Sequence, residues 1–217
     1  AAEASLKGRA IGLYDSSMSY MSQNNLNSSS PQNQSSQCLN AKGKLVLMLH
    51  DFFDSPHIYQ WLLFPDFWDW ANQTIQFCAT NQISLLIKPH PNQLPENETV
   101  IAKLRNKFQS YQCIQWLEKE TMNAQIFSEE PLAIVSAYGS VAAEAAYWQI
   151  PVLMAGDHPG INFKIAKVAG TKEEYFHLLS NINQIPKGSR TEAILFTAIH
   201  HQKNLDPSGK PTLISEL

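Results

Sequence analysis

Residues 132–160 constrain the fold more than any other part of the chain. They read LAIVSAYGSVAAEAAYWQIPVLMAGDHPG, in which the apolar runs 132–135 and 152–154 are short enough to be buried strands. A turn of small residues and an alanine-rich helix over residues 141–148 lie between these runs, and Pro151 ends the helix. Strand, turn, helix and strand make a βαβ unit, whose right-handed crossover places the turn at the carboxyl edge of a parallel sheet.

The turn at residues 136–140 is suited to an anion. The first amides of a helix lack internal partners and lie at the positive end of its dipole. Gly139 lets a ligand approach the backbone closely, Ser140 adds a hydroxyl group, and Glu144 could meet sugar hydroxyls one turn later. The alternative is an ordinary N-capped helix in an α/β core, and a turn with one glycine and one serine does not decide between the two.

The chain from Lys44 onward alternates short apolar runs with helical patterns. Further buried strands are predicted at residues 45–49, 84–87 and 111–116. Helices are predicted at residues 61–78, with a break near Pro65, and at 96–108, 121–128, 172–181 and 191–203. Strands that alternate with helices predict an α/β fold with a doubly wound, Rossmann-like parallel sheet.

Polar residues follow the first of these strands directly, in the sequence HDFFDSPH at residues 50–57. Polar side chains placed directly after a buried strand belong to the ligand-facing edge of an α/β sheet. The alternative is a loop in which Asp54 or Ser55 caps the next helix.

A second polar loop, KPHPN at residues 88–92, follows the strand at 84–87. Its two prolines preclude a helix and hold the loop rigidly, so that Lys88 and His90 are presented at the same sheet edge as His50 and Ser140. A lysine and a histidine beside the start of a helix suit a phosphate-bearing ligand. A third loop, AGDHPG at residues 155–160, follows the strand at 152–154 in the same manner.

Composition limits the classes of function. The chain has 217 residues, 44% of them hydrophobic, and a net charge of −3, without a basic run or an aromatic-interleaved patch that would bind nucleic acid. No apolar run reaches the length of a membrane span, and no signal-type segment is present. The cysteines at positions 38, 78 and 113 lack metal-ligand spacing and are odd in number, which predicts reduced thiols in a cytoplasmic protein.

One shift in composition predicts a domain boundary. Residues 15–40 are dominated by Ser, Asn and Gln, and such a segment buries too little apolar surface to offset its ordering entropy. Residues 1–43 are therefore interpreted as the remnant of a preceding domain plus a flexible linker, with an apolar patch at 10–14 that ends a strand. Residues 44–205 form the predicted α/β domain, and residues 206–217 form a loose tail.

The motifs HDFFDSPH, KPHPN, SAYGS with Glu144, and AGDHPG together resemble the carboxyl-terminal, donor-binding half of GT-B glycosyltransferases. Within that class, the chain is most similar to bacterial capsule and surface-polysaccharide enzymes that use CMP-activated sugars. In those families a His-Pro motif and a serine motif hold the nucleotide phosphate, and residues 88–91 and 138–140 look like these two motifs. The resemblance covers about residues 44–179.

The resemblance implies roles for individual residues. His90 would bind the phosphate and support departure of the nucleotide, Ser140 would hold the same phosphate, and Glu144 would contact the ribose. The loop at 156–159 would close over the base or the sugar. The implied ligands of the nucleotide sugar are Lys88, His90, Asn92, Tyr138, Gly139, Ser140, Glu144, Gly156, Asp157 and His158. The catalytic candidates are His90, Asp51 and Asp54, and neither a metal nor a separate cofactor is expected.

The catalytic base of such enzymes comes from an amino-terminal domain, which residues 1–40 are too short to form. The chain alone is therefore expected to bind a nucleotide sugar without elongating a glycan acceptor, in the cytoplasm and peripheral to the inner membrane. One alternative is a nucleotide-sugar-binding module without turnover. Another is a metal-dependent hydrolase, which has no standard ligand spacing to support it. Its candidate ligands are His50, Asp51, Asp54, His57, His90 and His158.

Overall fold

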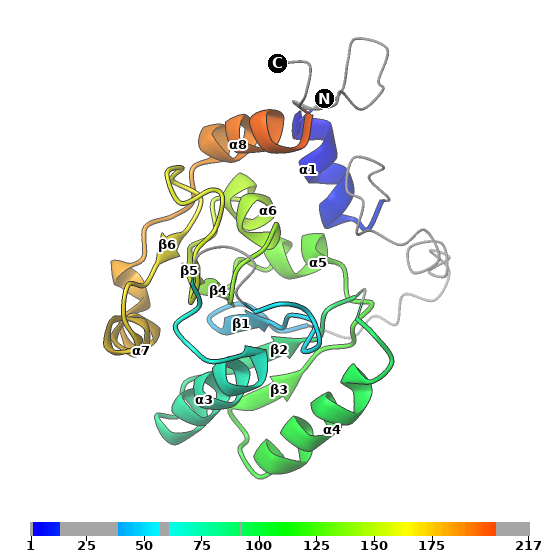
Figure 1. Ribbon diagram of the computed structural model, residues 1–217, viewed down its shortest axis with the longest axis vertical. Helices are drawn as coiled ribbons and strands as arrows, with labels where there is room; N and C mark the ends of the chain where they lie inside the picture. Colours follow the sequence, from blue (N-terminus) through cyan, green and yellow to red (C-terminus); the bar gives the residue numbers. More distant parts are fainter. Residues whose placement is uncertain (1, 14–38, 57–60, 92, 203–217) are drawn as a thin grey trace.

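The computed structural model describes residues 2–13, 39–56, 61–91 and 93–202, with side chains as far as His200 (Figure 1). Within these ranges the chain forms a single parallel sheet with helices on both faces. The predicted tail at 206–217 lies outside the described residues, as do Asn92, His57 and all of the predicted linker except residues 39–40.

The sheet has six strands in the order β3-β2-β1-β4-β5-β6, and every neighbouring pair is parallel. The strands are β1 (Leu45–Met48), β2 (Leu85–Lys88), β3 (Ile114–Trp116), β4 (Ala133–Ser136), β5 (Val152–Met154) and β6 (Lys167–Val168). This confirms the predicted doubly wound, Rossmann-like fold. The strand order reverses between β1 and β4, and ligands of such folds bind outside the carboxyl ends of the strands at this switch point.

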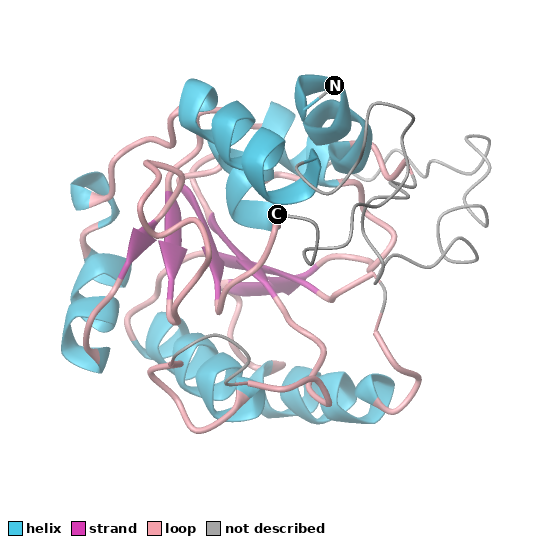
Figure 2. Cartoon of the chain, turned by 45° about the horizontal axis from the view of Figure 1, so that its top comes forward, coloured by secondary structure: helices cyan, strands magenta, loops and turns pink. Residues whose placement is uncertain are grey.

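The helices form two layers that enclose the sheet (Figure 2). The first layer contains α3 (Phe67–Thr80), α4 (Asn97–Phe108) and α7 (Lys172–Ser180). The second contains α1 (Ala2–Ala10), α5 (Asn123–Ser128), α6 (Val141–Tyr147) and α8 (Arg190–Gln202). A short 3₁₀ helix, η2 (Ile182–Gln184), follows α7. Helices on both faces explain why the central strands are continuous apolar runs instead of alternating patterns.

Side-chain alternation along the central strands divides the core into two parts. Leu45 and Leu47 of β1 pack toward α3, whereas Val46 and Met48 pack toward α6. In β2, Leu86 packs on the α6 side, so Lys88 two residues later shares that side. The sheet therefore directs a lysine side chain into the layer that contains α5 and α6.

The structure differs from the sequence predictions at helix α1 and at strand β6. The apolar patch at 10–14 was predicted to end a strand, but Ala10 instead ends helix α1, which packs against α6 and α8. Leu6 and Ala10, one turn apart, bury the same side of α1, and such a short helix depends on tertiary contacts for its stability. Strand β6 has only two half-buried residues and therefore no apolar run to reveal it.

Among the described residues, no helix combines the length and the apolar character needed to cross a lipid bilayer.

Candidate functional site

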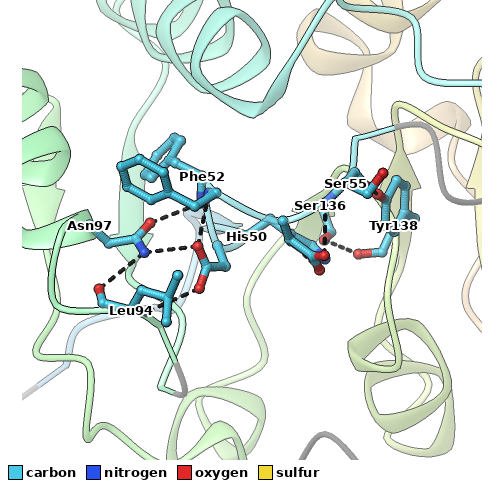
Figure 3. Close-up of polar contacts among 10 residues, drawn as sticks. His50, Phe52, Ser55, Leu94, Asn97, Ser136 and Tyr138 are labelled. Atoms are coloured by element: carbon cyan, nitrogen blue, oxygen red, sulfur yellow. Dashed lines mark hydrogen bonds and ion pairs between the residues drawn. The ribbon is translucent and has the colours of Figure 1, made fainter.

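The candidate site lies at the switch point, where the loops after β1, β2 and β4 leave the sheet (Figure 3). His50 comes two residues after β1, and His90 two residues after β2. Tyr138 comes two residues after β4. Parallel strands end at one edge, so these three side chains meet although 88 positions in the sequence separate the first from the last.

An aromatic cluster forms the centre of the site. The His50 ring stacks on Phe67 of α3 with centroids 4.3 Å apart, lies 5.9 Å from the His90 ring, and meets Tyr138 edge-on at 5.1 Å. The Tyr138 hydroxyl donates a 2.7 Å hydrogen bond to the Ser55 carbonyl, which ties the loop after β4 to the loop after β1. Burial lowers the pKa of His50, and Asp54, whose Oδ2 is 3.8 Å from His50 Nδ1, opposes this shift.

Lys88 is a buried cation without a partner charge in contact. The residue ends β2 and is only 4% exposed, and no hydrogen bond or ion pair joins its ammonium to another described residue. Burial lowers its pKa from 10.5 to about 8, against the opposing effect of Glu144 and Glu120. Buried charges in proteins are normally paired. A buried ammonium without such a partner therefore suits the binding of an anionic ligand.

His90 lies beside Lys88 and is kept neutral. Burial is the main reason why its pKa falls to about 4, and the nearby His50 and Lys88 act in the same direction while Asp51 opposes them. A neutral imidazole can donate one hydrogen bond to a phosphate, and it can take up a proton when a negative charge arrives.

Asp51 is held by an intramolecular network. Its carboxylate accepts hydrogen bonds from Asn97 Nδ2 at 2.8 Å, from the Phe53 amide at 2.9 Å and from the Leu94 amide at 3.0 Å (Figure 3). Burial alone would raise the pKa of Asp51, but these hydrogen bonds outweigh it and lower the pKa below 3.8. The network fixes the loop after β1 against the start of α4. Asp54, the other predicted acid of this loop, is half exposed, with 51% of its side chain accessible.

The turn before α6 has an open backbone. Ser136 Oγ donates to the Tyr138 carbonyl at 3.1 Å, and Gly139 has a φ of +132°. Apart from its two chain neighbours, no described residue has a heavy atom within 4 Å of the position that a Cβ at Gly139 would occupy. Ser140 makes no side-chain capping hydrogen bond to α6, so the alternative of an ordinary serine N-cap is not what the structure shows.

Glu144 is engaged by protein groups on both carboxylate oxygens. Arg9 Nη2 of α1 donates to Oε1 at 3.0 Å, and Asn123 Nδ2 of α5 donates to Oε2 at 2.8 Å. The Arg9 and Glu144 side chains are 4% and 6% exposed. The expected contact of Glu144 with a ribose stays a prediction. Neither Arg9 nor Asn123 was found from the sequence, because no spacing connects residues so far apart in the chain.

The loop after β5 divides between the two sides of the sheet. A Cβ at Gly156 would lie 3.1 Å from the Tyr138 ring and from the Trp61 carbonyl, and the Asp157 amide donates to the same carbonyl at 2.9 Å. His158 instead packs on Phe196 of α8, and its Nδ1 accepts from the Gly160 amide at 2.9 Å. The structure therefore brings Gly156 to the aromatic cluster and places His158 among the residues that pack on α8.

The described residues contain no group of three or more His, Cys, Asp or Glu side chains that could hold a metal ion. Of the six residues considered for a metal-dependent hydrolase, His158 packs toward α8 and His57 lies outside the described ranges.

Comparisons with known proteins identify the fold. No protein-family model matches the sequence, and no curated protein sequence matches it significantly. The structure is similar to the UDP-GlcNAc 2-epimerase of Methanocaldococcus jannaschii, solved with UDP-GlcNAc and UDP, with a TM-score of 0.50 and 13% identity over 91% of this chain. MnaA of S. aureus, solved with UDP, gives a TM-score of 0.45 and 15% identity over 81% of this chain and 50% of its own. The chain spans 52% of the length of the first epimerase, and what it shares with that enzyme is the Rossmann-like fold.

Proposed function

We propose that this chain binds a nucleotide-activated sugar at the carboxyl edge of β1, β2 and β4, as the donor-binding half of a glycosyltransferase. The observation that carries this proposal is the buried Lys88, which pairs with no other residue that the structure describes and which ends β2, next to the topological switch point. A phosphate group would supply the missing negative charge, and every nucleotide sugar carries phosphate.

The side chains around Lys88 suit the departure of a nucleotide. Negative charge builds up on the phosphate as the bond to the sugar breaks, and preorganised positive or hydrogen-bonding groups stabilise it. Lys88 and His90 supply such groups. Gly156, packed against Tyr138, brings the start of the loop after β5 to the aromatic cluster, where it could cover the base or the sugar.

The donor proposed from the motifs is a CMP-linked sugar used in capsule or surface polysaccharide synthesis, with a glycan as acceptor. The epimerase that shares the fold was solved with UDP-GlcNAc and UDP, which makes a UDP-linked sugar the competing donor. Both donors carry phosphate on a pyrimidine nucleoside, so Lys88 serves either one.

A second candidate is binding without turnover, which the state of Asp51 favours. A general base works best with a pKa near the working pH, but the hydrogen bonds to Asp51 lower its pKa below 3.8. Asp54 is the remaining acid of this loop that could act as a base.

A nucleotide panel tests the proposal. The midpoint of thermal unfolding should rise with CMP, CDP, UMP, UDP or GDP, because a ligand that binds only the folded state stabilises it by its concentration relative to Kd. Cytidine and uridine, which lack the phosphate, should shift the midpoint much less. Equal shifts with and without phosphate would refute the assignment of Lys88. Incubation with CMP-sugars and UDP-sugars, with and without glycan acceptors, then separates transfer from binding alone.

Gly139→Ala should impair nucleotide binding without a steric clash. A residue with a side chain is strained at φ +132°, so the turn must change shape, and we expect the free energy of unfolding to fall by about 1–2 kcal/mol. Gly43→Ala is the matched control, because Gly43 also has a positive φ of +75° and open space around its Cβ position. Only Gly139→Ala should weaken nucleotide affinity in calorimetry; equal affinities in both variants would show that the turn does not contact the ligand.

A further inference from the structure

A buried ion pair connects the amino-terminal helix to the candidate site. Arg9 in the last turn of α1 donates to Glu144 in the first turn of α6 at 3.0 Å, and almost none of either side chain is exposed. Asn123 of α5 donates to the other oxygen of Glu144. A buried pair of this kind contributes little net stability, because the desolvation of both ions opposes their attraction. Its retention therefore calls for another explanation.

Glu144 and Lys88 occupy the same side of the sheet. Lys88 follows Leu86 on the side of β2 that packs toward α6, and the Glu144 charge is the largest of the effects that favour the Lys88 ammonium. Glu120, after β3, acts in the same direction, and His90 is the nearby basic group. Yet Glu144 forms its ion pair with Arg9, while Lys88 forms none with a described residue.

We propose that Arg9 is a positioning residue of the anion site: it holds the Glu144 carboxylate in a separate ion pair, so that Lys88 stays available to a phosphate-bearing ligand. The part that concerns the ligand rests on the function proposed above. Helix α1 is then a component of the site, since it supplies the charge that balances Glu144. Without Arg9, the carboxylate would be left to Lys88, and an incoming phosphate would have to displace it.

Titration of Lys88 in the ligand-free protein tests the arrangement directly. Lysines carrying ¹³C-methyl groups can be followed by NMR, with Lys88→Met identifying the signal. Arg9→Met should raise the pKa of Lys88 by about one unit or more, as an opposite charge does at short range. Glu144→Gln should lower it, because Arg9 then remains as an unbalanced cation. The double variant should return close to the wild type.

Phosphate binding provides the second measurement, with inorganic phosphate and CMP as probes. Affinity should fall at least about tenfold in Arg9→Met and recover in the double variant. The control is Arg190→Met, which removes the exposed ion pair between α8 and Glu3 of α1 and should change neither the titration nor the affinity. An effect of Arg190→Met as large as that of Arg9→Met would mean that docking of α1, and not the charge of Arg9, matters.

Two outcomes separate the proposals. If Arg9→Met does not fold, the role of Arg9 is tested by comparing Glu144→Gln with the double variant, because these two proteins differ only at Arg9. An identical Lys88 titration in the two proteins would overturn the role of Arg9. If the wild type binds neither phosphate nor nucleotide, the proposed function fails, while the Lys88 titration still tests the positioning by Arg9.

Discussion

Lys88→Met should weaken nucleotide binding by about 10- to 100-fold and at the same time stabilise the fold. A charge-assisted hydrogen bond to phosphate contributes about 1.5–3 kcal/mol, and 1.4 kcal/mol corresponds to a factor of ten in affinity. The opposite effect on stability follows from burial. Lowering the pKa of Lys88 from 10.5 to about 8 means that the folded state holds the ammonium at a cost of up to about 3 kcal/mol near neutral pH.

The stability gain should depend on pH. Below pH 8 the ammonium is present in both the folded and the unfolded state, and its burial opposes folding. Between pH 8 and 10.5 the folded state binds fewer protons than the unfolded state, so the stability of the wild type should rise with pH. Denaturant unfolding at pH 7 and pH 10 should show this rise in the wild type and not in Lys88→Met. At pH 7 the variant should be more stable by about 1–3 kcal/mol.

Lys44→Met is the matched control. Lys44 directly precedes β1, at the opposite edge of the sheet, where its ammonium bonds to Gln115 Oε1 at the surface. Its substitution should change neither nucleotide affinity nor the dependence of stability on pH. A Lys88→Met protein that is less stable than the wild type and binds CMP equally well would show that Lys88 is structural.

Combined gain of stability and loss of binding is the behaviour expected of a ligand site. A fold selected only for stability would fill the end of β2 with an apolar residue, as at Leu86 and Ile87. Instead, two basic groups, Lys88 and His90, are buried at this edge, and burial lowers both pKa values well below their ordinary range. Perturbed groups gathered in this way are typical of functional sites.

Most of the sheet could be predicted from the sequence, for a physical reason. Strands buried on both faces are continuous apolar runs, so residues 45–48 and 133–136 are evident without a structure. Parallel strands also end at one edge, which is why His50, Lys88, His90 and Ser140 could be assigned to one sheet edge before any contact was known.

The contacts that tune the site could not be predicted in this way. Asp51 reads as a candidate base in the sequence, and only the structure shows that Asn97, 46 residues later, engages its carboxylate. Arg9 lies in a helix with little amphipathic pattern, and its partner Glu144 is 135 residues away. Long-range polar pairs have no period in the sequence, because each depends on how separate elements pack and not on local spacing.

Nucleotide affinity should fall by up to tenfold for each pH unit above 8. Lys88, with a pKa of about 8 in the free protein, gains a phosphate as its partner on binding, which raises its pKa in the complex. Binding above pH 8 must therefore take up a proton, and its free energy becomes less favourable as protons become scarce. The charges of Glu144 and Glu120 act on Lys88, and so does His90, whose pKa of about 4 lies well below this range. A phosphate monoester, with a second pKa of about 6, also titrates below it.

Calorimetry in two buffers of different ionisation enthalpy measures this proton uptake. At pH 9 the wild type should take up nearly one proton per CMP bound, and Lys88→Met should take up none. At pH 7 Lys88 is already about nine-tenths charged, so uptake beyond roughly a tenth of a proton belongs to His90, whose pKa of about 4 should rise beside the phosphate. His90→Gln should remove that component and leave the uptake at pH 9. Affinity that stays constant from pH 7 to pH 10 would exclude Lys88 from the phosphate site.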